Sequence, residues 1–211
     1  MKKLLSLLAI AALVSVASAN LLVNGDFEAG DLDLLPPGWT EVKLNALGVG
    51  ILTTNALPPS NMAGHIDFGG LPAEAYIYQQ VNVAIDSFFD VFVEFFAYTG
   101  GAEPADWHHF GLGLDPTGGT DYFGPNVIKV EVQDKEARGA AEGDILALDC
   151  LQALSDTVTV FLYSKMDDAN AGWWAHGHDN ATLEECIIPE PGTMLLIGTG
   201  LLGLVGLARR K

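Results

Sequence analysis

Short runs rich in β-branched and aromatic residues, bounded by glycine or proline, most limit how this chain can fold. Such runs are typical of β-strands, and turn-forming stretches such as residues 57–60 and 115–119 separate them. Many short strands without a long helical period favour two packed sheets. We therefore predict an all-β sandwich whose strands include residues 76–83, 91–98, 110–114, 127–132 and 158–163.

Residues 135–154 are the one segment whose composition also fits a helix. Gly139 and Gly143 interrupt it, and glycine inside a helix costs about 1 kcal/mol relative to alanine. We therefore do not expect a continuous helix there.

The N-terminal segment differs from this pattern. Residues 1–19 contain two lysines, an apolar run over residues 4–16 and the small residues Ala17-Ser18-Ala19. This is the layout of a secretory signal peptide. An uncleaved anchor is the alternative, but the apolar run is shorter than the ~20 residues that cross a bilayer. We expect signal peptidase to cleave after Ala19, which leaves residues 20–188 as one domain.

The C-terminal segment, residues 189–211, opens with a motif of four residues: Pro189, Glu190, Pro191 and Gly192. An uncharged apolar stretch of about 16 residues follows, slightly short for a permanent membrane helix. Three basic residues end the chain and are expected to stay in the cytoplasm. The two prolines keep the backbone around the glutamate extended, as a protease cleft requires.

These three parts, in this order, resemble the PEP-CTERM sorting signal of Gram-negative bacteria that make exopolysaccharide. The resemblance implies processing by an exosortase, a membrane-embedded cysteine protease. It also implies transient anchoring in the inner membrane and delivery to the cell surface or extracellular matrix. An ordinary C-terminal anchor behind a proline-rich linker is the alternative. The signal indicates where the protein goes and not what the domain does.

Residues 20–188 are strongly acidic, with five basic and 26 acidic residues and a net charge of −21. Such a domain repels nucleic acid and anionic lipid, so nucleic acid is excluded as a partner. The charge suits divalent cations or, more simply, solubility in a salty exterior.

The two cysteines, Cys150 and Cys186, both lie in the part expected to be exported, where oxidation is allowed. They are candidates for one disulfide closing a loop of about 35 residues, worth roughly 3–4 kcal/mol. Two buried free thiols are the alternative.

Short motifs near both ends of the domain carry a second resemblance. Residues 24–28 read Asn-Gly-Asp-Phe-Glu, a Gly-Trp pair follows at 38–39, and Asp179-Asn180-Ala181 lies near the end. These motifs resemble the galactose-binding-like jelly roll of CenC-type carbohydrate-binding modules and bacterial surface domains. The resemblance implies a jelly-roll β-sandwich with residues 24–28 in the opening strand and residues 179–181 in the final strand.

In many such jelly rolls a first-strand glutamate and a last-strand aspartate bind a structural Ca²⁺. At the matching positions of this chain the implied ligands are Glu28 and Asp179. Backbone carbonyls of nearby loops would complete the oxygen shell that a hard cation prefers. The alternative is that both carboxylates are solvated surface groups.

Four of the five histidines fall in two places, each beside tryptophan. His176 and His178 are two residues apart and therefore share a face of a strand. Together with His108 or His109 they are candidate imidazole ligands of a transition metal. The alternative is that these are rim histidines next to aromatic packing residues.

The neighbouring tryptophans are candidate glycan contacts: Trp107, Trp173 and Trp174. Aromatic faces stack on sugar rings, while nearby Asp, Asn and His side chains bind hydroxyls. At least one of the three is expected in the core, as large aromatic residues usually are.

Signs of catalysis are weak. The sequence has no Gly-x-Ser-x-Gly elbow, and acidic pairs are not diagnostic in so acidic a chain. We therefore expect an exported, exosortase-sorted surface or biofilm-matrix protein whose non-catalytic domain binds extracellular polysaccharide. A purely structural envelope protein without sugar affinity is the main alternative, and a glycan-active hydrolase is the third.

Overall fold

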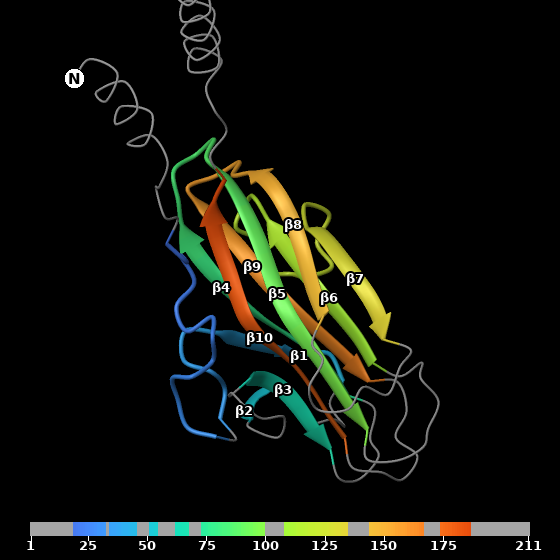
Figure 1. Ribbon diagram of the computed structural model, residues 1–211. Coiled ribbons are helices and arrows are strands. Elements are labelled where there is room, and N and C mark those ends of the chain that lie inside the picture. The colour runs from blue at the N-terminus through green and yellow to red at the C-terminus, as the bar shows by residue number, and fades with distance from the viewer. Residues whose placement is uncertain are drawn as a thin grey trace, which may run out of the picture.

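The computed structural model describes residues 19–32, 34–45, 51–54, 62–67, 73–99, 108–134, 144–166 and 174–186. Strands account for most of these residues: β1 (Thr40–Lys43), β2 (Leu52–Thr54), β3 (Met62–Asp67), β4 (Ala73–Asn82), β5 (Phe88–Thr99), β6 (His108–Asp115), β7 (Ile128–Asp134), β8 (Asp144–Gln152), β9 (Thr157–Met166) and β10 (Trp174–Glu185). They form two five-stranded sheets that pack face to face (Figure 1). Sheet A has the order β1-β4-β9-β6-β7, and sheet B has the order β2-β3-β10-β5-β8.

The path of the chain through strands β3 to β10 is that of a jelly roll. Sheet A contains the order β4-β9-β6-β7 and sheet B the order β3-β10-β5-β8, with every neighbouring pair antiparallel. These are the two four-stranded halves of an eight-stranded jelly roll. The predicted all-β jelly-roll sandwich is therefore confirmed.

Each of the five predicted strand runs overlaps an observed strand; in chain order these are β4, β5, β6, β7 and β9. The ambiguous segment 135–154 contains β8 over Asp144–Gln152, so its described part is extended rather than helical. In β8 only Leu146 is fully buried, which is why the segment lacks a clear strand pattern.

The N-terminal motif is not the opening strand that the resemblance implies. Residues 23–26 form a turn, and Asn24 and Phe27 have φ angles of 53° and 54°. This left-handed conformation does not continue an extended strand. Phe27 is nevertheless a core residue, because its side chain is fully buried with its ring 5.5 Å from that of Trp39.

The same N-terminal segment covers an irregular part of β10. The pairing of β10 with β5 shifts register between Asp179 and Thr182. The Asn20 side chain donates to the carbonyl of Ala181 at 3.0 Å and accepts from the Leu183 N–H at 3.1 Å. These bonds satisfy backbone groups of β10 beyond His178, where its pairing with β3 has ended.

The core lies between the sheets and is filled by alternate side chains of both. Phe110 of β6 and Phe95 of β5 meet across it with ring centroids 4.7 Å apart. Phe110 also contacts His178 of β10. Both residues lie near the starts of their strands, so β6, which begins at His108, and β10, which begins at Trp174, start at the same end of the sandwich. We call this the loop end. In these ranges no helix is long and apolar enough to span a membrane.

Candidate functional site

The outer face of sheet A carries a cluster of aromatic side chains. Tyr76 of β4, and Phe161 and Tyr163 of β9, turn away from the core and pack on one another. Tyr122, from the loop between β6 and β7, completes the cluster and stacks on Tyr163 with centroids 4.8 Å apart. Outward aromatic residues on two neighbouring strands therefore form a second apolar layer outside the sandwich.

Two glycines of β6 make room for Tyr122. A Cβ at Gly111 would overlap the Tyr122 hydroxyl, and one at Gly113 would lie 3.0 Å from a methyl group of Val127. The Tyr122 ring therefore lies against backbone where any other residue would present a side chain.

Hydrogen bonds hold the loop between β6 and β7 against sheet A. Asp115, at the end of β6, accepts from the backbone N–H of Thr117 at 2.7 Å and from its hydroxyl at 2.6 Å. The Tyr76 hydroxyl donates to the carbonyl of Thr120, and Gln80 donates to the carbonyl of Gly118. The loop is thus tied to β4 at two points, which positions Tyr122.

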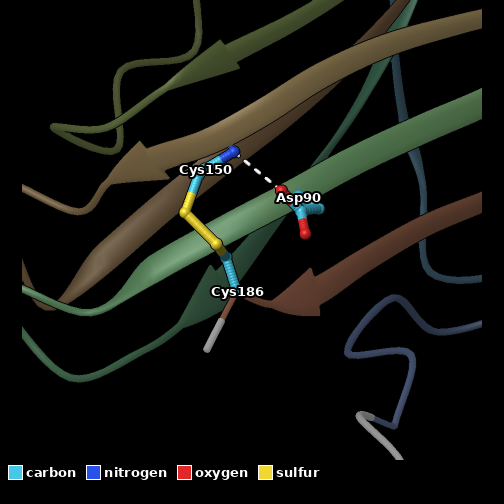
Figure 2. A group of neighbouring side chains, drawn as sticks. All are labelled: Asp90, Cys150 and Cys186. Atoms are coloured by element: carbon cyan, nitrogen blue, oxygen red, sulfur yellow. Dashed lines mark hydrogen bonds between the residues drawn. A yellow bond between two sulfur atoms is a disulfide. The ribbon is translucent and has the colours of Figure 1, made fainter. Parts of the chain in front are cut away.

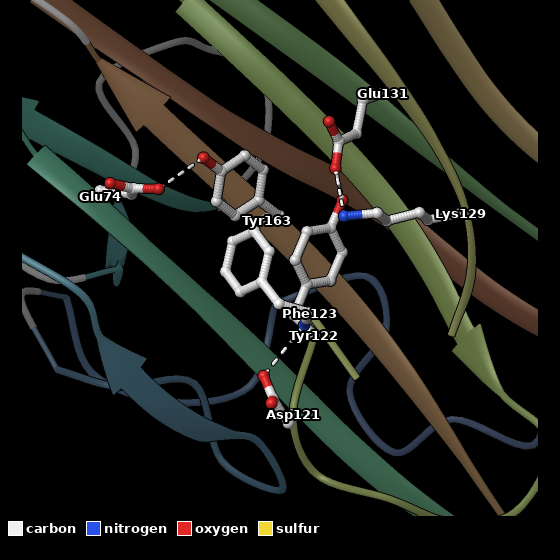
Figure 3. A network of polar contacts seen from close by, with 7 residues as sticks. All are labelled: Glu74, Asp121, Tyr122, Phe123, Lys129, Glu131 and Tyr163. Atoms are coloured by element: carbon white, nitrogen blue, oxygen red, sulfur yellow. Dashed lines mark hydrogen bonds and ion pairs between the residues drawn. The ribbon is translucent and has the colours of Figure 1, made fainter. Parts of the chain in front are cut away.

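A charged group lies beside the covered ring (Figure 3). The Tyr122 hydroxyl donates to Glu131 Oε1 at 2.9 Å, and Lys129 Nζ lies 2.9 Å from the same oxygen. Lys129 Nζ is also 4.5 Å from the centre of the Tyr122 ring, a cation–π distance. Tyr122 from the loop and Lys129 from β7 therefore bind the same carboxylate oxygen of Glu131.

The pKa values of this group follow from its surroundings. Burial raises the pKa of Tyr122 far above its ordinary value, and the charge of Glu131 adds to the effect. Burial also raises the pKa of Glu131, but Lys129 and Tyr122, with a smaller effect from His109, outweigh it and leave the value lowered. Glu131 is therefore a carboxylate, and Tyr122 a neutral hydrogen-bond donor, at neutral pH.

A row of polar side chains crosses the outer face next to the aromatic cluster, towards the loop end. Strand register places four residues side by side, one on each of the neighbouring strands β4, β9, β6 and β7: Glu74, Lys165, His109 and Gln133. We call these the polar row. The Tyr163 hydroxyl donates to Glu74 at 2.8 Å and so joins the polar row to the aromatic cluster.

Phe123 is the exposed aromatic residue of this surface. Its ring is 51% exposed and meets the rings of Tyr122 and Tyr163 edge to face, at 5.1 and 5.8 Å. Figure 3 shows it beside Tyr163, between Glu74 and Lys129. An apolar ring is thus held in place beside donors and acceptors of both charges. We call Phe123, the polar row and the Lys129–Glu131 pair the sheet A surface.

The sequence predictions did not include this surface. Its signal is that β4 and β9 carry large apolar residues on both faces, Tyr76 and Tyr78 beside Ile77, and Phe161 and Tyr163 beside Leu162. A strand with one solvated face alternates apolar and polar residues, so this departure indicates a covered or functional outer face.

The predicted glycan-binding tryptophans can be placed only in part. Trp107 and Trp173 lie outside the described residues, and each immediately precedes a described strand at the loop end, β6 and β10. Trp174 is the first residue of β10 and pairs with Asp67 and Thr99.

The structure separates two of the four predicted metal-binding histidines. His178 is fully buried in the core, with its ring edge-to-face on Phe110. His109 precedes Phe110 in β6 and therefore faces the other way, onto the outer face of sheet A. These two residues do not form one site. His108 and His176 are strand residues, and His176 pairs with His65 of β3.

The segments that carry the two predicted calcium ligands lie together. The Ala181 N–H donates to the carbonyl of Gly25 at 2.8 Å, which joins the turn before Glu28 to the strand after Asp179. Asp179 is 2% exposed, whereas Glu28 is exposed. In the described part of the chain, these two do not belong to a group of three side chains placed to hold a metal ion.

The two cysteines form the disulfide for which the sequence made them candidates, with Cα atoms 5.5 Å apart (Figure 2). Cys150 lies in β8 with a φ of 50°, where the pairing of β8 with β5 changes register. The carboxylate of Asp90 in β5 accepts the Cys150 N–H at 2.7 Å. Asp90 and the two sulfur atoms form the one cluster of potential metal ligands found among described residues, but both sulfurs are already bonded.

The four residues of the predicted sorting motif, 189–192, lie outside the described residues. Residues 188–211 match the family model for the PEP-CTERM protein-sorting motif. No curated protein matches the sequence.

Solved structures share the fold. TmCBM61, solved in complex with β-1,4-galactotriose, is 16% identical; the match covers 80% of this chain and 100% of that chain, with a TM-score of 0.54. The Stig cyclase FisC from Fischerella sp. TAU is 15% identical over 81% of this chain and 98% of its own, with a TM-score of 0.52. One architecture thus serves a module with a bound oligosaccharide and a cyclase, so the site must decide the function. The chain carries the PEP-CTERM sorting motif behind a jelly-roll domain similar to that of a carbohydrate-binding module.

Proposed function

We propose that this protein is displayed at the cell surface or in the extracellular matrix of a Gram-negative bacterium, where it binds carbohydrate without catalysis. The PEP-CTERM motif implies export and processing by an exosortase. The signal-peptide layout of residues 1–19 supports the same route, with signal peptidase cleavage after Ala19 and transient anchoring in the inner membrane.

The observation that carries the binding proposal is the sheet A surface. A sugar ring has an apolar face and an edge of hydroxyls, so its site needs an aromatic ring beside hydrogen-bonding groups. Phe123 supplies the ring, and the polar row supplies donors and acceptors next to it. Trp107 directly precedes β6 in the sequence and is a further candidate glycan contact.

The ordered state of this surface favours binding. Phe123 is held by two aromatic contacts, and the polar row belongs to a sheet rather than to a loop. A surface that is already in its binding conformation pays less entropy when a ligand arrives. TmCBM61 suggests β-linked galactose oligomers as the first ligands to test.

The carboxylate of Glu131 favours binding over hydrolysis at this surface. A glycosidase acid must carry a proton at working pH, and its pKa is raised for that purpose. The pKa of Glu131 is lowered instead, because Lys129 and Tyr122 stabilise the charge.

A glycan array and affinity electrophoresis on the native exopolysaccharide test the proposal with the full chain. Phe123→Ala and Lys165→Ala should each weaken binding about fivefold to 30-fold, since a stacked ring or a charged hydrogen bond contributes roughly 1–2 kcal/mol. Leu154→Ala, which alters an exposed apolar residue in the turn between β8 and β9, is the control and should bind normally. Absence of binding to any glycan would favour a purely structural envelope protein.

We also propose that Glu28 and Asp179 hold a structural Ca²⁺. The Gly25–Ala181 hydrogen bond supports this, since it brings their segments together. Calcium should then raise the melting temperature of the wild type relative to a chelator, and should raise that of Glu28→Gln by less. Equal shifts in the two proteins would show that Glu28 is not a ligand.

A further inference from the structure

The outer face of sheet B has a composition of its own. Strand β5 lies between β10 and the edge strand β8, and its inward residues are buried core members. The alternate residues face outward and are half-buried: Phe88, Asp90, Phe92, Glu94 and Phe96. Phenylalanine and carboxylate therefore alternate along one outward line. Ile145 on the adjacent strand β8 is 59% exposed and pairs with Glu94.

Charge is divided unevenly between the two sheets. The strands of sheet A contain three lysines, Lys43, Lys129 and Lys165, with five acidic residues. The strands of sheet B contain eight acidic residues and neither lysine nor arginine. Among the strands, those of sheet B are therefore the more acidic, and they also carry the outward phenylalanines.

The carboxylates of this face lie at strand positions that repeat. Glu184 of β10 pairs with Asp90, and Asn180 of β10 donates to Glu94 at 3.0 Å. Asp90 and Glu94 are four residues apart on one strand, which corresponds to about 13 Å. In Figure 1, β10, β5 and β8 lie side by side in the sheet nearer the viewer.

We propose that the outer face of sheet B docks an extended, basic polypeptide segment. An extended chain places alternate side chains on one face at about 6.8 Å, the same repeat as the line of Phe and carboxylate on β5. Lysine or arginine side chains of the partner pair with Glu94 and Glu184 and lie over the rings of Phe92 and Phe96. Apolar partner residues between them cover Ile145. This surface is separate from the sheet A surface and does not depend on sugar binding.

Fluorescence anisotropy with a labelled decalysine peptide tests the proposal, using the full chain in a non-ionic detergent. The wild type should bind the peptide, and added salt should weaken the binding. The double variant Glu94→Gln and Glu184→Gln should bind about fivefold to tenfold more weakly, because two surface ion pairs are lost.

A matched variant separates this face from the general acidity of the protein. Asp26→Asn with Asp31→Asn removes the same charge from the exposed N-terminal segment and should bind like the wild type. Equal weakening by the two double variants would overturn the proposal, since binding would then follow net charge alone.

A third variant tests the aromatic contribution. Phe92→Leu with Phe96→Leu keeps an apolar face but removes the π systems, and should weaken binding about fivefold. Unchanged melting temperatures show that the variants are folded. No decalysine binding by the wild type, or tighter binding of a glucosamine oligomer than of decalysine, would overturn the assignment to a basic polypeptide.

Discussion

At the residue scale, Gly111 decides whether the outer face of sheet A can be covered. Its missing side chain leaves the space that the Tyr122 hydroxyl occupies between β6 and Glu131. A single methyl group there would displace a ring that holds Phe123 in place.

Gly111→Ala should therefore destabilise the domain by about 1–3 kcal/mol, the usual cost of overpacking. Gly113→Ala is the comparison variant, since its Cβ would lie 3.0 Å from the Val127 side chain and 3.2 Å from the Tyr122 ring, contacts that need only a small adjustment. Urea unfolding measures both, and near-ultraviolet circular dichroism reports on the Tyr122–Tyr163 stack. Destabilisation by Gly111→Ala of less than about 1 kcal/mol would mean that Tyr122 can shift at little cost.

Glu131 gives the stability of the domain a pH dependence on the acid side. Its folded-state pKa is below the ordinary value of 4.5, so the folded state holds the ionised form more strongly than the unfolded state does. The resulting stability is present above about pH 4.5 and is lost as the pH falls through the folded-state pKa.

The difference in melting temperature between wild type and Glu131→Gln should therefore shrink as the pH falls from 6 to 3. Thermal unfolding followed by circular dichroism at each pH measures it. A difference that stays constant over this range would show that the carboxylate charge is not what stabilises the contact with Lys129.

At the element scale, the disulfide joins the end of β10 to β8 across the start of β5. Cys186 follows Glu185, the last residue of β10, and its N–H donates to the carbonyl of Phe88 at 2.7 Å. The cross-link thus holds the last strand of the domain immediately before the sorting motif at residues 188–211.

Cys150→Ser with Cys186→Ser should lower the free energy of unfolding by roughly 3–4 kcal/mol, given the 36-residue separation. Denaturant unfolding of this variant, and of the wild type with and without a reductant, measures the effect. The variant and the reduced wild type should agree. If reduction leaves the free energy of unfolding of the wild type unchanged, opening the disulfide gives the unfolded chain little additional conformational freedom.

At the scale of the whole molecule, the C-terminal motif decides where the domain is delivered. Replacing Pro189, Glu190 and Pro191 by alanine should leave the protein in the membrane fraction instead of the surface or medium fraction. Cell fractionation with immunoblotting in an exosortase-containing host measures this. Glu184→Ala, just upstream of the motif, is the control and should be sorted normally. Normal sorting of the triple variant would show that these residues do not direct it.

The proposals divide the two outer faces of the sandwich between two partners. The sheet A surface combines Phe123 with groups of both charges, which suits a neutral ligand rich in hydroxyls. The outer face of sheet B combines phenylalanine with carboxylates alone among its charged groups, which suits a basic partner. A surface protein with two such faces would link polysaccharide to a basic protein.

Local signals in the sequence determined several features of this protein. The all-β class follows from strand runs bounded by turn residues, and the candidate cysteine pair and the sorting motif were visible in sequence because each is carried by a few particular residues. The strand expected at residues 24–28 came from the resemblance, although Asn-Gly at 24–25 is itself a turn signal; the φ of 54° at Phe27 is unusual for an aromatic residue.

Only the tertiary structure decided which residues form the two faces. The polar row comes from four strands far apart in sequence, and the Tyr122 contact needs a loop folded back on β9. The buried position of His178 likewise depends on Phe110, which reaches it from the opposite sheet. Strand pairing over long sequence separations sets these neighbours, and residue composition along a single strand carries no record of its partners.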